Sequence, residues 1–471
     1  MMRAGAAQVE ITPPLGTHLA GDGAGIHRPA RKILDPLYAR ALVVESDQRR
    51  VCLLAMDLLC VTAEYTQAIR TEAARRFGLE PDAILVHTEQ NHSAPSLGAL
   101  MFDPDFPFRA PPDKEYIGGA ESRYCAFAVQ KAIEAIGKAC SSLRHVRMGW
   151  GRGVLEGLAF NRRAIQTDGT IGMPWFYSSE AMPLGPTQIR AMEGPFDPEV
   201  GVVCLQDESM GVAAMLLNFS CHPVNLYATD RNAASGEWPG AWAADMQAAF
   251  NEGGVPLVLN GCCGNLNPWP PFTPDFKPDH RRMGTALGAM SRKVIERMAF
   301  SEQAIVDWRT RRVALRYREV PEARRQEADR ILSDHPEMKW DLARGEVDVQ
   351  WFLAASTKSI EYCRKRWPEF PYDIQVFRIG ATAVVGLPGE PFVEGQLEIK
   401  IASPAALVQV AHMCTHYVGY IPTRAATARG GHEAAELCTY WAKLAPDSLD
   451  IIVQTVKSML TELFAGETER P

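Results

Sequence analysis

The 471-residue chain lacks an apolar run long enough to span a membrane, which takes about 20 residues. It has no block of Lys and Arg, and its 49 basic residues are outnumbered by 56 acidic ones, giving a formal net charge of −7. This balance argues against a nucleic-acid partner. The opening residues Met1–Ala7 lack the apolar core of a secretion signal. We therefore expect a cytoplasmic protein without a membrane anchor that acts on a small-molecule substrate, with homo-oligomerisation left open.

Cysteine motifs for zinc fingers or thioredoxin-like chemistry are also missing, because no C-x-x-C spacing occurs. The chain has eleven cysteines, and Cys52, Cys60, Cys204 and Cys221 stand in apolar runs. An odd number of cysteines in such surroundings is typical of reduced, buried thiols in a cytosolic protein.

Short apolar runs, each ending at polar or turn-forming residues, predict the strands of a sheet that helices cover. The runs are Val51–Met56, Ala83–Val86, Val212–Leu217, Pro256–Leu259 and Thr382–Leu387. Helical patterns alternate with them, which indicates an α/β architecture. The first predicted helix has Thr62 as its N-cap, reaches Phe77 and ends at Gly78. The others are Tyr124–Lys138, Ala241–Asn251, Arg281–Met298, Pro321–Leu332 and Ala434–Leu463, with a break at Pro446.

Nothing in the chain demands a second domain, so we expect one large domain over residues 1–471. Residues 309–367 are more charged and helical, and they predict a peripheral helical insertion. Two Pro- and Gly-rich excursions, Met101–Tyr116 and Gly172–Pro198, are too long for ordinary connections and predict ordered loops or lids near a site. In the second excursion, the aromatic residues at 175–177 could cap an apolar or sugar ligand.

Polar clusters follow the predicted strands, and these clusters are the candidate functional segments. Asn218–Pro223 places His222 just past a buried strand, where a histidine can bind a metal or simply be hydrogen-bonded in the core. His87–Pro95 brings two histidines, an acid and two amides into one loop, and imidazole with carboxylate suits zinc. Asn260–Pro268 offers amide donors between glycines, or else a structural turn.

Two later segments add an acid and aromatic residues. Glu390 is held between Pro388 and Pro391, which suits a ligand or a general base better than a solvated charge. Tyr417–Thr423 carries two tyrosines, and His432 follows twelve residues past Tyr420. A tyrosine in an apolar run can also be plain packing.

Taken together and in this order, the segments resemble the neutral/alkaline non-lysosomal ceramidase family over nearly the whole chain. Gly5–Pro14 is similar to the family's opening G-x-x-x-x-D-I-T-P, and Asp35–Ala41 to its next block. Asn218–Pro223 resembles N-F-x-x-H-P, Gly389–Glu390 resembles P-G-E, and Tyr420–Thr423 with His432–Glu433 resembles Y-x-T-T…Y-E. The resemblance implies mixed β-sheets covered by helices, as in the ceramidase catalytic domain without the C-terminal sandwich domain.

The resemblance also implies a site that holds zinc or another divalent transition metal and hydrolyses an amide. The predicted metal ligands are His92, His222, Glu390 and Tyr420. The predicted catalytic residues are His92, Asn267, Tyr420 and His432, and the predicted substrate-binding residues are Arg162, from the pair Asn161–Arg162, and Asn265.

Two departures from the family pattern bear on these roles. Where the family has T-H-T-H-S-G-P, Gln90 replaces the first histidine, so that either His92 or His87 must complete a metal site. Where the family has G-D-V-S-P, Asn265 replaces the aspartate and Asn267 the serine. Asparagine can stabilise an oxyanion but cannot act as a nucleophile.

We therefore expect a metal-dependent hydrolase of an amide or ester bond in a small soluble substrate, not in membrane ceramide. The alternative is a lyase or glycoside-cleaving enzyme for an acidic sugar, with Tyr420 and His432 as acid and base and Arg162 on a carboxylate. A binding protein without activity is the third hypothesis.

Overall fold

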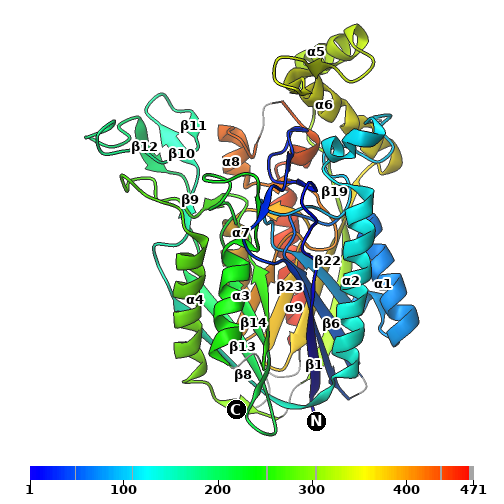
Figure 1. Cartoon of the computed structure of the whole chain (residues 1–471), viewed down its shortest axis with the longest axis vertical. Helices are drawn as coiled ribbons and strands as arrows, with labels where there is room; N and C mark the ends of the chain where they lie inside the picture. The colour runs from blue at the N-terminus through cyan, green and yellow to red at the C-terminus, as the bar shows by residue number, and fades with distance from the viewer. Residues whose placement is uncertain (48, 109, 251–252, 303–304, 435–436, 466–471) are drawn as a thin grey trace.

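A computed structural model describes residues 1–47, 49–108, 110–250, 253–302, 305–434 and 437–465. A central core is enclosed by β-sheets, and helices cover the outer faces of those sheets (Figure 1). The loops that carry the predicted site lie toward the end of the molecule opposite the N-terminus (Figure 1).

The larger sheet has nine strands and is mixed. Its order is β16 (Val255–Asn260), β14 (Val212–Phe219), β13 (Glu199–Asp207), β8 (Arg144–Val154), β1 (Arg3–Glu10), β5 (Tyr38–Ser46), β6 (Arg49–Met56) and β7 (Ile84–Thr88), with β18 (Phe300–Ser301) beside β8. Only the pairs β14–β16 and β6–β7 are parallel. A parallel pair needs a crossover, which α3 (Glu237–Ala249) and α1 (Ala63–Phe77) supply.

The second sheet has four strands, β19 (Val306–Leu315), β22 (Phe370–Ile379), β23 (Thr382–Gly386) and β25 (Leu407–Ala411). Strands β23 and β25 are parallel, and α7 (Val393–Ala402) connects them. One buried cluster joins this sheet to both halves of the larger one, through side chains that include Leu53, Leu85, Leu216, Leu257, Trp308, Phe377 and Val384. The sheets therefore share one apolar core.

Alternate side chains of these strands point outward to the helices. On β5, Leu42 and Val44 face the central core, whereas Ala41 and Val43 pack against α1 and α2 (Ser122–Ser141). Burial on both faces explains why these strands read as continuous apolar runs. In the same way, α3 and α4 (His280–Ile295) cover β13 and β14. Helices α7 and α9 (Ser448–Phe464) cover the second sheet, and α6 (Val349–Arg366) adds Ile360 and Cys363 to the same buried cluster.

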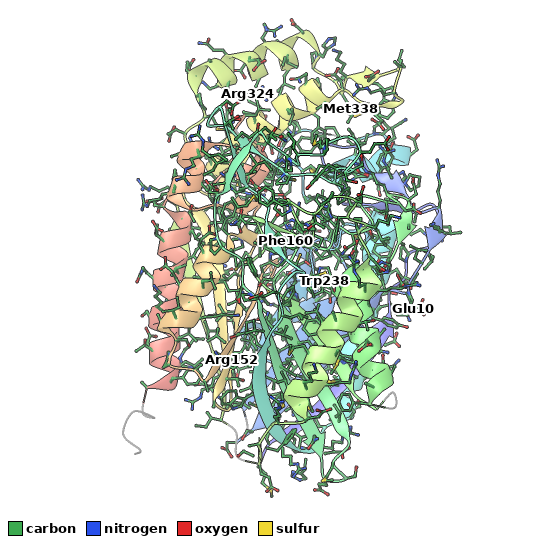
Figure 2. The ribbon with its side chains drawn as sticks, turned by 90° about the vertical axis from the view of Figure 1, so that its left-hand side faces the viewer. Glu10, Arg152, Phe160, Trp238, Arg324 and Met338 are labelled. Carbon is green, nitrogen blue, oxygen red and sulfur yellow. The ribbon has the colours of Figure 1, made fainter. Side chains whose placement is uncertain are left out.

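The helices α5 (Glu322–Asp334) and α6 lie at the end opposite the N-terminus (Figure 1). Figure 2 places Arg324 and Met338 at this end, and Phe160 and Trp238 nearer the middle of the molecule. The remaining elements are short: β2 (His18–Leu19), β3 (Arg28–Pro29), β4 (Lys32–Ile33), β9 (Phe160–Asn161), β10 (Ala164–Gln166), β11 (Ile171–Gly172), β12 (Ile189–Met192), β15 (Ala233–Ala234), β17 (Leu266–Asn267), β20 (Trp340–Asp341), β21 (Glu346–Val347), β24 (Glu390–Pro391), β26 (Tyr420–Ile421), α8 (Arg424–Arg429), η1 (Pro81–Ala83), η2 (Pro112–Gly118) and η3 (Tyr440–Ala442).

The mixed α/β class and the five predicted strands are confirmed, and α1 has its predicted bounds, with Gly78 left-handed at φ 66°. The helix predicted over Ala434–Leu463 is wrong in its first half, where residues 437–447 form the η3 turn and a β-bridge from Leu444 to Tyr317; residues 435–436 lie outside the described residues. Residue 251 of another predicted helix and residue 109 of a predicted loop also lie outside them. Residues 309–315, in the predicted helical insertion, belong to the strand β19.

All eleven cysteines lie in the described part of the chain, and all are free thiols; ten are buried and Cys140 is half-buried. Across the described ranges, no helix combines the length and the apolarity needed to cross a bilayer.

Phe377 on β22 tests the shared core. Its side chain is fully buried between the two sheets. We expect Phe377→Ala to lower the free energy of unfolding by about 3–5 kcal/mol, because a cavity replaces the ring. Urea denaturation followed by circular dichroism measures the change. Phe377→Leu should lower the free energy of unfolding less than Phe377→Ala, because leucine fills more of the cavity. A loss below about 1 kcal/mol in the alanine variant would contradict a single shared core.

Candidate active site

A cavity of about 420 Å³ opens where loops from both sheets meet. The predicted site residues that line it are His92, Arg162, Asn267, Glu390, Tyr420 and His432. They come from the loops that follow β7, β9, β16, β23 and β25, and from the segment after α8. Strand ends are rigid and the loops after them are free to vary, so this edge suits a functional site.

One residue, Asn260 at the end of β16, joins three loops through its side chain and its backbone carbonyl. Its Nδ2 group donates to the carbonyl oxygens of Glu89 at 2.8 Å and Cys221 at 3.0 Å, and its Oδ1 accepts from the Cys221 N–H at 3.2 Å. Its own carbonyl accepts from the His412 N–H at 3.0 Å. Asn260 thereby fixes the loops after β7, β14 and β25 relative to one another.

Glu390 and Tyr420 are neighbours because β24 pairs with β26 in parallel, with these two residues in register. One oxygen of the Glu390 carboxyl accepts a short hydrogen bond from the Gln90 amide, and the other accepts from the Tyr417 hydroxyl at 3.3 Å. Burial raises the pKa of Glu390, and Arg162 and His92 only partly offset that effect.

His222 is fully buried three residues past β14. Its Nδ1 donates to the carbonyls of Cys263 and Leu266, at 2.6 and 3.0 Å, so its lone pair lies on Nε2. Nε2 lies 3.6 Å from a carboxylate oxygen of Glu390 and 3.4 Å from Nη1 of Arg162. Burial and the charge of Arg162 lower the pKa of His222 well below its ordinary value, so the imidazole is neutral near pH 7.

His92 lines the cavity with its ring centre 5.6 Å from that of His222. Its Nδ1 donates to the Gly21 carbonyl at 2.9 Å, which leaves Nε2 as an acceptor. Burial and the nearby His222 lower the pKa of His92 to about 3.

Arg162 is positioned by the pairing of β9 with β17. Its Nε donates to Glu433 at 2.7 Å and its Nη1 to Oδ1 of Asn267 at 3.3 Å. Its Nη2 is buried without a hydrogen-bond partner among the described side chains and backbone. Glu433 also accepts from Arg163 at 2.7 Å, so one carboxylate holds two arginines.

Tyr420 and His432 form a second polar pair, with 3.4 Å between the hydroxyl and Nε2. Burial, followed by Arg162, lowers the pKa of His432. Burial, followed by the charge of Glu390, raises the pKa of Tyr420. Both groups are therefore neutral near pH 7, and either can donate or accept a proton.

Two residues considered at the site are turned away from the cavity. The side chain of Asn265 donates to Glu394 at 2.9 Å and accepts from the Val393 N–H at 3.1 Å. His87 belongs to β7, where Nδ1 donates to the His412 carbonyl at 2.7 Å and Nε2 accepts from the Asn260 N–H at 3.2 Å. His87 therefore cannot take the place of the histidine ligand that Gln90 replaces.

The outer wall is aromatic, as predicted for the loop Gly172–Pro198. Met173 and Trp175 from this loop line the cavity, and Trp175 meets Trp269 edge to face with ring centres 4.6 Å apart. Phe176 packs on the same indole at 5.1 Å. Trp269 and Trp441 line the cavity too, although no sequence motif pointed to them, and Tyr417 lines it from the candidate segment Tyr417–Thr423.

The fold is that of the neutral ceramidase catalytic domain, as the sequence motifs implied. The crystal structure of the neutral ceramidase from Pseudomonas aeruginosa matches with a TM-score of 0.71 at 17% identity, over 98% of this chain and 74% of that one. A ceramidase complexed with C2 matches with a TM-score of 0.69 at 17% identity, over 98% and 75% of the two chains. No family model and no curated protein matches the sequence.

The residues present do not fit a divalent metal. Within the described ranges, no three His, Cys, Asp or Glu side chains are grouped so that they could share an ion. The guanidinium of Arg162 faces Nε2 of His222, the nitrogen that would bind an ion. A cation here would lie against a permanent positive charge, which disfavours it.

Gln90 tests this conclusion. We expect the wild-type protein to bind no stoichiometric zinc, because the amide of Gln90 is a poor zinc ligand. Gln90→His should raise zinc affinity, since it adds an imidazole next to Glu390. Elemental analysis and titration calorimetry measure both, with Gln90→Asn as the matched control. Stoichiometric zinc in the wild type, lost in Glu390→Gln, would refute the conclusion.

Glu433 gives a pH-dependent test of the paired arginines. Burial alone would raise its pKa, but Arg162, His432 and Arg163 outweigh burial and hold the pKa at about 2. Because this value lies below the unfolded value of about 4.3, the pair stabilises the protein above that pH and loses its effect as pH falls toward 2.

We expect Glu433→Gln to lower the free energy of unfolding at pH 7 by about 3–5 kcal/mol, because it leaves buried charges unpaired. The difference from the wild type should shrink between about pH 4 and pH 2. Denaturant unfolding at a series of pH values measures it, with the exposed Glu322→Gln as control. A pH-independent difference would contradict the ionised state of Glu433.

Proposed function

We propose that the protein is a hydrolase that cleaves an amide or ester bond in a small substrate. The observation that carries this proposal is the buried Nη2 of Arg162, which has no hydrogen-bond partner among the described residues, while Nη1 of the same guanidinium lies beside His222 and Asn267. A preorganised donor in a site of low dielectric stabilises the negative charge that develops on a carbonyl oxygen during hydrolysis. The ceramidase fold supports the same reaction class, since a ceramidase cleaves an amide.

Each polar group then has one role. Glu390 is the general base that takes a proton from the attacking water, and its raised pKa brings it closer to the working pH. Arg162 Nη2 donates to the oxyanion, and Asn267 adds its Nδ2, because its Oδ1 is occupied by Arg162. The pair of His432 and Tyr420 returns a proton to the leaving group. His92 Nε2 accepts a hydrogen bond from the substrate or the water.

The shape and lining of the cavity suit a small molecule with an apolar part. Its volume of about 420 Å³ is in the usual range for such ligands. Trp175, Trp269 and Met173 supply an apolar wall opposite the polar floor. The role predicted for a metal is not part of this proposal, because Arg162 provides the positive charge.

A lyase for an acidic sugar is the second candidate. The contact of Tyr420 with His432 supports it, since a neutral acid–base pair can remove a proton next to a carboxylate. In that case the free Nη2 of Arg162 would bind the carboxylate of the sugar.

Substitution of Arg162 tests the proposed activity, and substitution of an exposed arginine controls for general effects on the structure. On a panel of N-acyl compounds, esters and uronides, we expect Arg162→Met to lower kcat/KM by about 10²–10³, the usual loss for one oxyanion donor. Arg190→Met removes an exposed arginine and should leave kcat/KM unchanged. Liquid chromatography of the products identifies the bond that is cut.

The products decide between the two candidates. A free acid together with an amine or alcohol supports the hydrolase. A product with a new conjugated double bond, detected by ultraviolet absorbance, would replace it with the lyase. Turnover that Arg162→Met leaves unchanged would contradict both roles of Arg162.

A further inference from the structure

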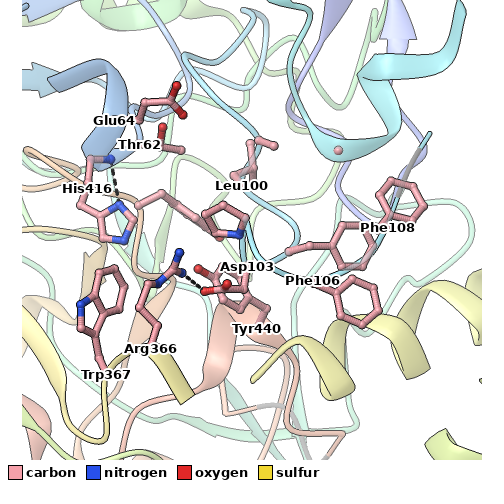
Figure 3. A pocket seen from close by; sticks show the side chains of 16 residues that line it. Thr62, Glu64, Leu100, Asp103, Phe106, Phe108, Arg366, Trp367, His416 and Tyr440 are labelled. Carbon is pink, nitrogen blue, oxygen red and sulfur yellow. Dashed lines mark hydrogen bonds and ion pairs between the residues drawn. The ribbon is translucent and has the colours of Figure 1, made fainter. Parts of the chain in front are cut away.

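Figure 3 shows a second cavity, and this cavity shares lining residues with the candidate active site. Its volume is about 350 Å³, which suits a small ligand. Leu100 and Tyr417 line both cavities, so the two spaces are separated by single side chains.

Aromatic rings form much of the second cavity. Phe102 stacks on Phe106 with ring centres 5.5 Å apart and lies 4.6 Å from Phe108. Trp367 and Tyr440 add two more rings to the lining. Such a lining favours a flat, apolar ligand body.

His416 places a hydrogen-bond donor in this lining. Its Nδ1 accepts from the Ala63 N–H at 3.1 Å, so the proton of the neutral ring is on Nε2. Burial, followed by Lys443 and Arg366, lowers the pKa of His416 to about 3, and the ring is neutral near pH 7. Nε2 is buried and has no partner in the part of the chain that the structure describes.

Arg366 lies beside His416 in the same lining (Figure 3). Its Nη2 is paired with Asp103 and its Nη1 lies 3.2 Å from Asp105, but its Nε is buried without a partner among the described residues. Two buried donors without acceptors are unfavourable, and a ligand that brings acceptor oxygens satisfies both.

The charges around the cavity determine the kind of acceptor. Arg366 and the buried Lys443 carry positive charge, Asp103 and Asp105 are already paired with Arg366, and Glu64 is exposed at the start of α1. A charge-assisted bond to a guanidinium is stronger than a neutral one, which favours a carboxylate over an uncharged carbonyl.

The wall connects this cavity to the proposed chemistry. His416 and Tyr417 are consecutive, and Tyr417 donates to Glu390 at 3.3 Å while His416 lines the second cavity. In the turn before His416, two residues have left-handed backbone conformations, Met413 with φ 50° and Thr415 with φ 67°. A ligand that presses on Tyr417 therefore alters a hydrogen bond of the proposed general base.

We propose that the second cavity binds a small aromatic carboxylate and that Tyr417 transmits its occupancy to Glu390. Binding stands on this cavity alone, whereas the consequence for catalysis rests on the function proposed above for Glu390.

Titration calorimetry with phenylacetate tests binding. We expect saturable binding to the full chain, weaker by about tenfold or more for uncharged phenylacetamide. Ala99→Trp, at an exposed position on the rim, should abolish binding by filling the cavity. Arg366→Met should weaken it by about tenfold, and Lys365→Met, next to it in sequence, should not change it.

Several results would overturn the site. They are no saturable binding by the wild type, equal affinity for the acid and the amide, or undiminished binding by Ala99→Trp. The first would mean that the cavity binds no aromatic carboxylate, the second that it does not select the carboxylate, and the third that the acid binds elsewhere. Melting curves check folding, and Ala99→Trp keeps the test valid if Arg366→Met fails to fold with Asp103 unpaired.

The link to Glu390 is tested without a substrate, so its failure is distinct from failure of the proposed function. Dicyclohexylcarbodiimide labels buried carboxyl groups, and peptide mass spectrometry measures its rate at Glu390. We expect phenylacetate to change that rate by about fivefold or more in the wild type. Tyr417→Phe should remove the change. An equal rate with and without phenylacetate in the wild type would overturn the link.

Discussion

The hydrogen bonds of Asn260 are the constraint on which the site depends. The loops after β7, β14 and β25 each follow a buried strand. They come close together where these strands end. Asn260 bonds to Glu89, Cys221 and His412, one residue from each loop. Because the amide is fully buried, losing it would leave several backbone groups without partners.

The order imposed by Asn260 is what gives the neighbouring polar groups a fixed geometry. Gln90 and His92 follow Glu89, and His222 follows Cys221 directly. With these loops fixed, Gln90 and His222 both lie next to the same carboxylate oxygen of Glu390. The strands supply rigidity, and the loops supply the chemistry.

Much of this arrangement was predictable from the sequence, because buried strands read as apolar runs and polar residues at their ends stand out. His222, Glu390 and Tyr420 are in one cluster for that reason. Orientation was not predictable: Asn265 and Asn267 are two residues apart, yet only Asn267 lines the cavity. The extent of β7 could not be predicted either. Because β7 continues to Thr88, the side chain of His87, a candidate ligand in the sequence, bonds to the backbone carbonyl of His412 instead.

The helix α7 and the role of Tyr417 were also missed. Helix α7 follows Pro391 closely and is short, and it buries four of its ten residues, so its pattern is weak. Tyr417 gains its importance from Glu390, 27 residues earlier, and from a cavity wall that only the tertiary structure creates. Contacts of this kind leave no local periodicity.

Charge balance connects Gln90 with the lack of a metal-binding group of side chains among the described residues. From the cavity to the surface, the carboxylates of Glu390, Glu433 and Glu193 face the guanidinium groups of Arg162, Arg163 and the exposed Arg429. With all six ionised, the cluster is neutral. A divalent ion would leave two uncompensated positive charges in a buried site, which is costly. Gln90 adds no charge and donates to Glu390, so it keeps the carboxylate oriented toward the cavity while the cluster stays balanced.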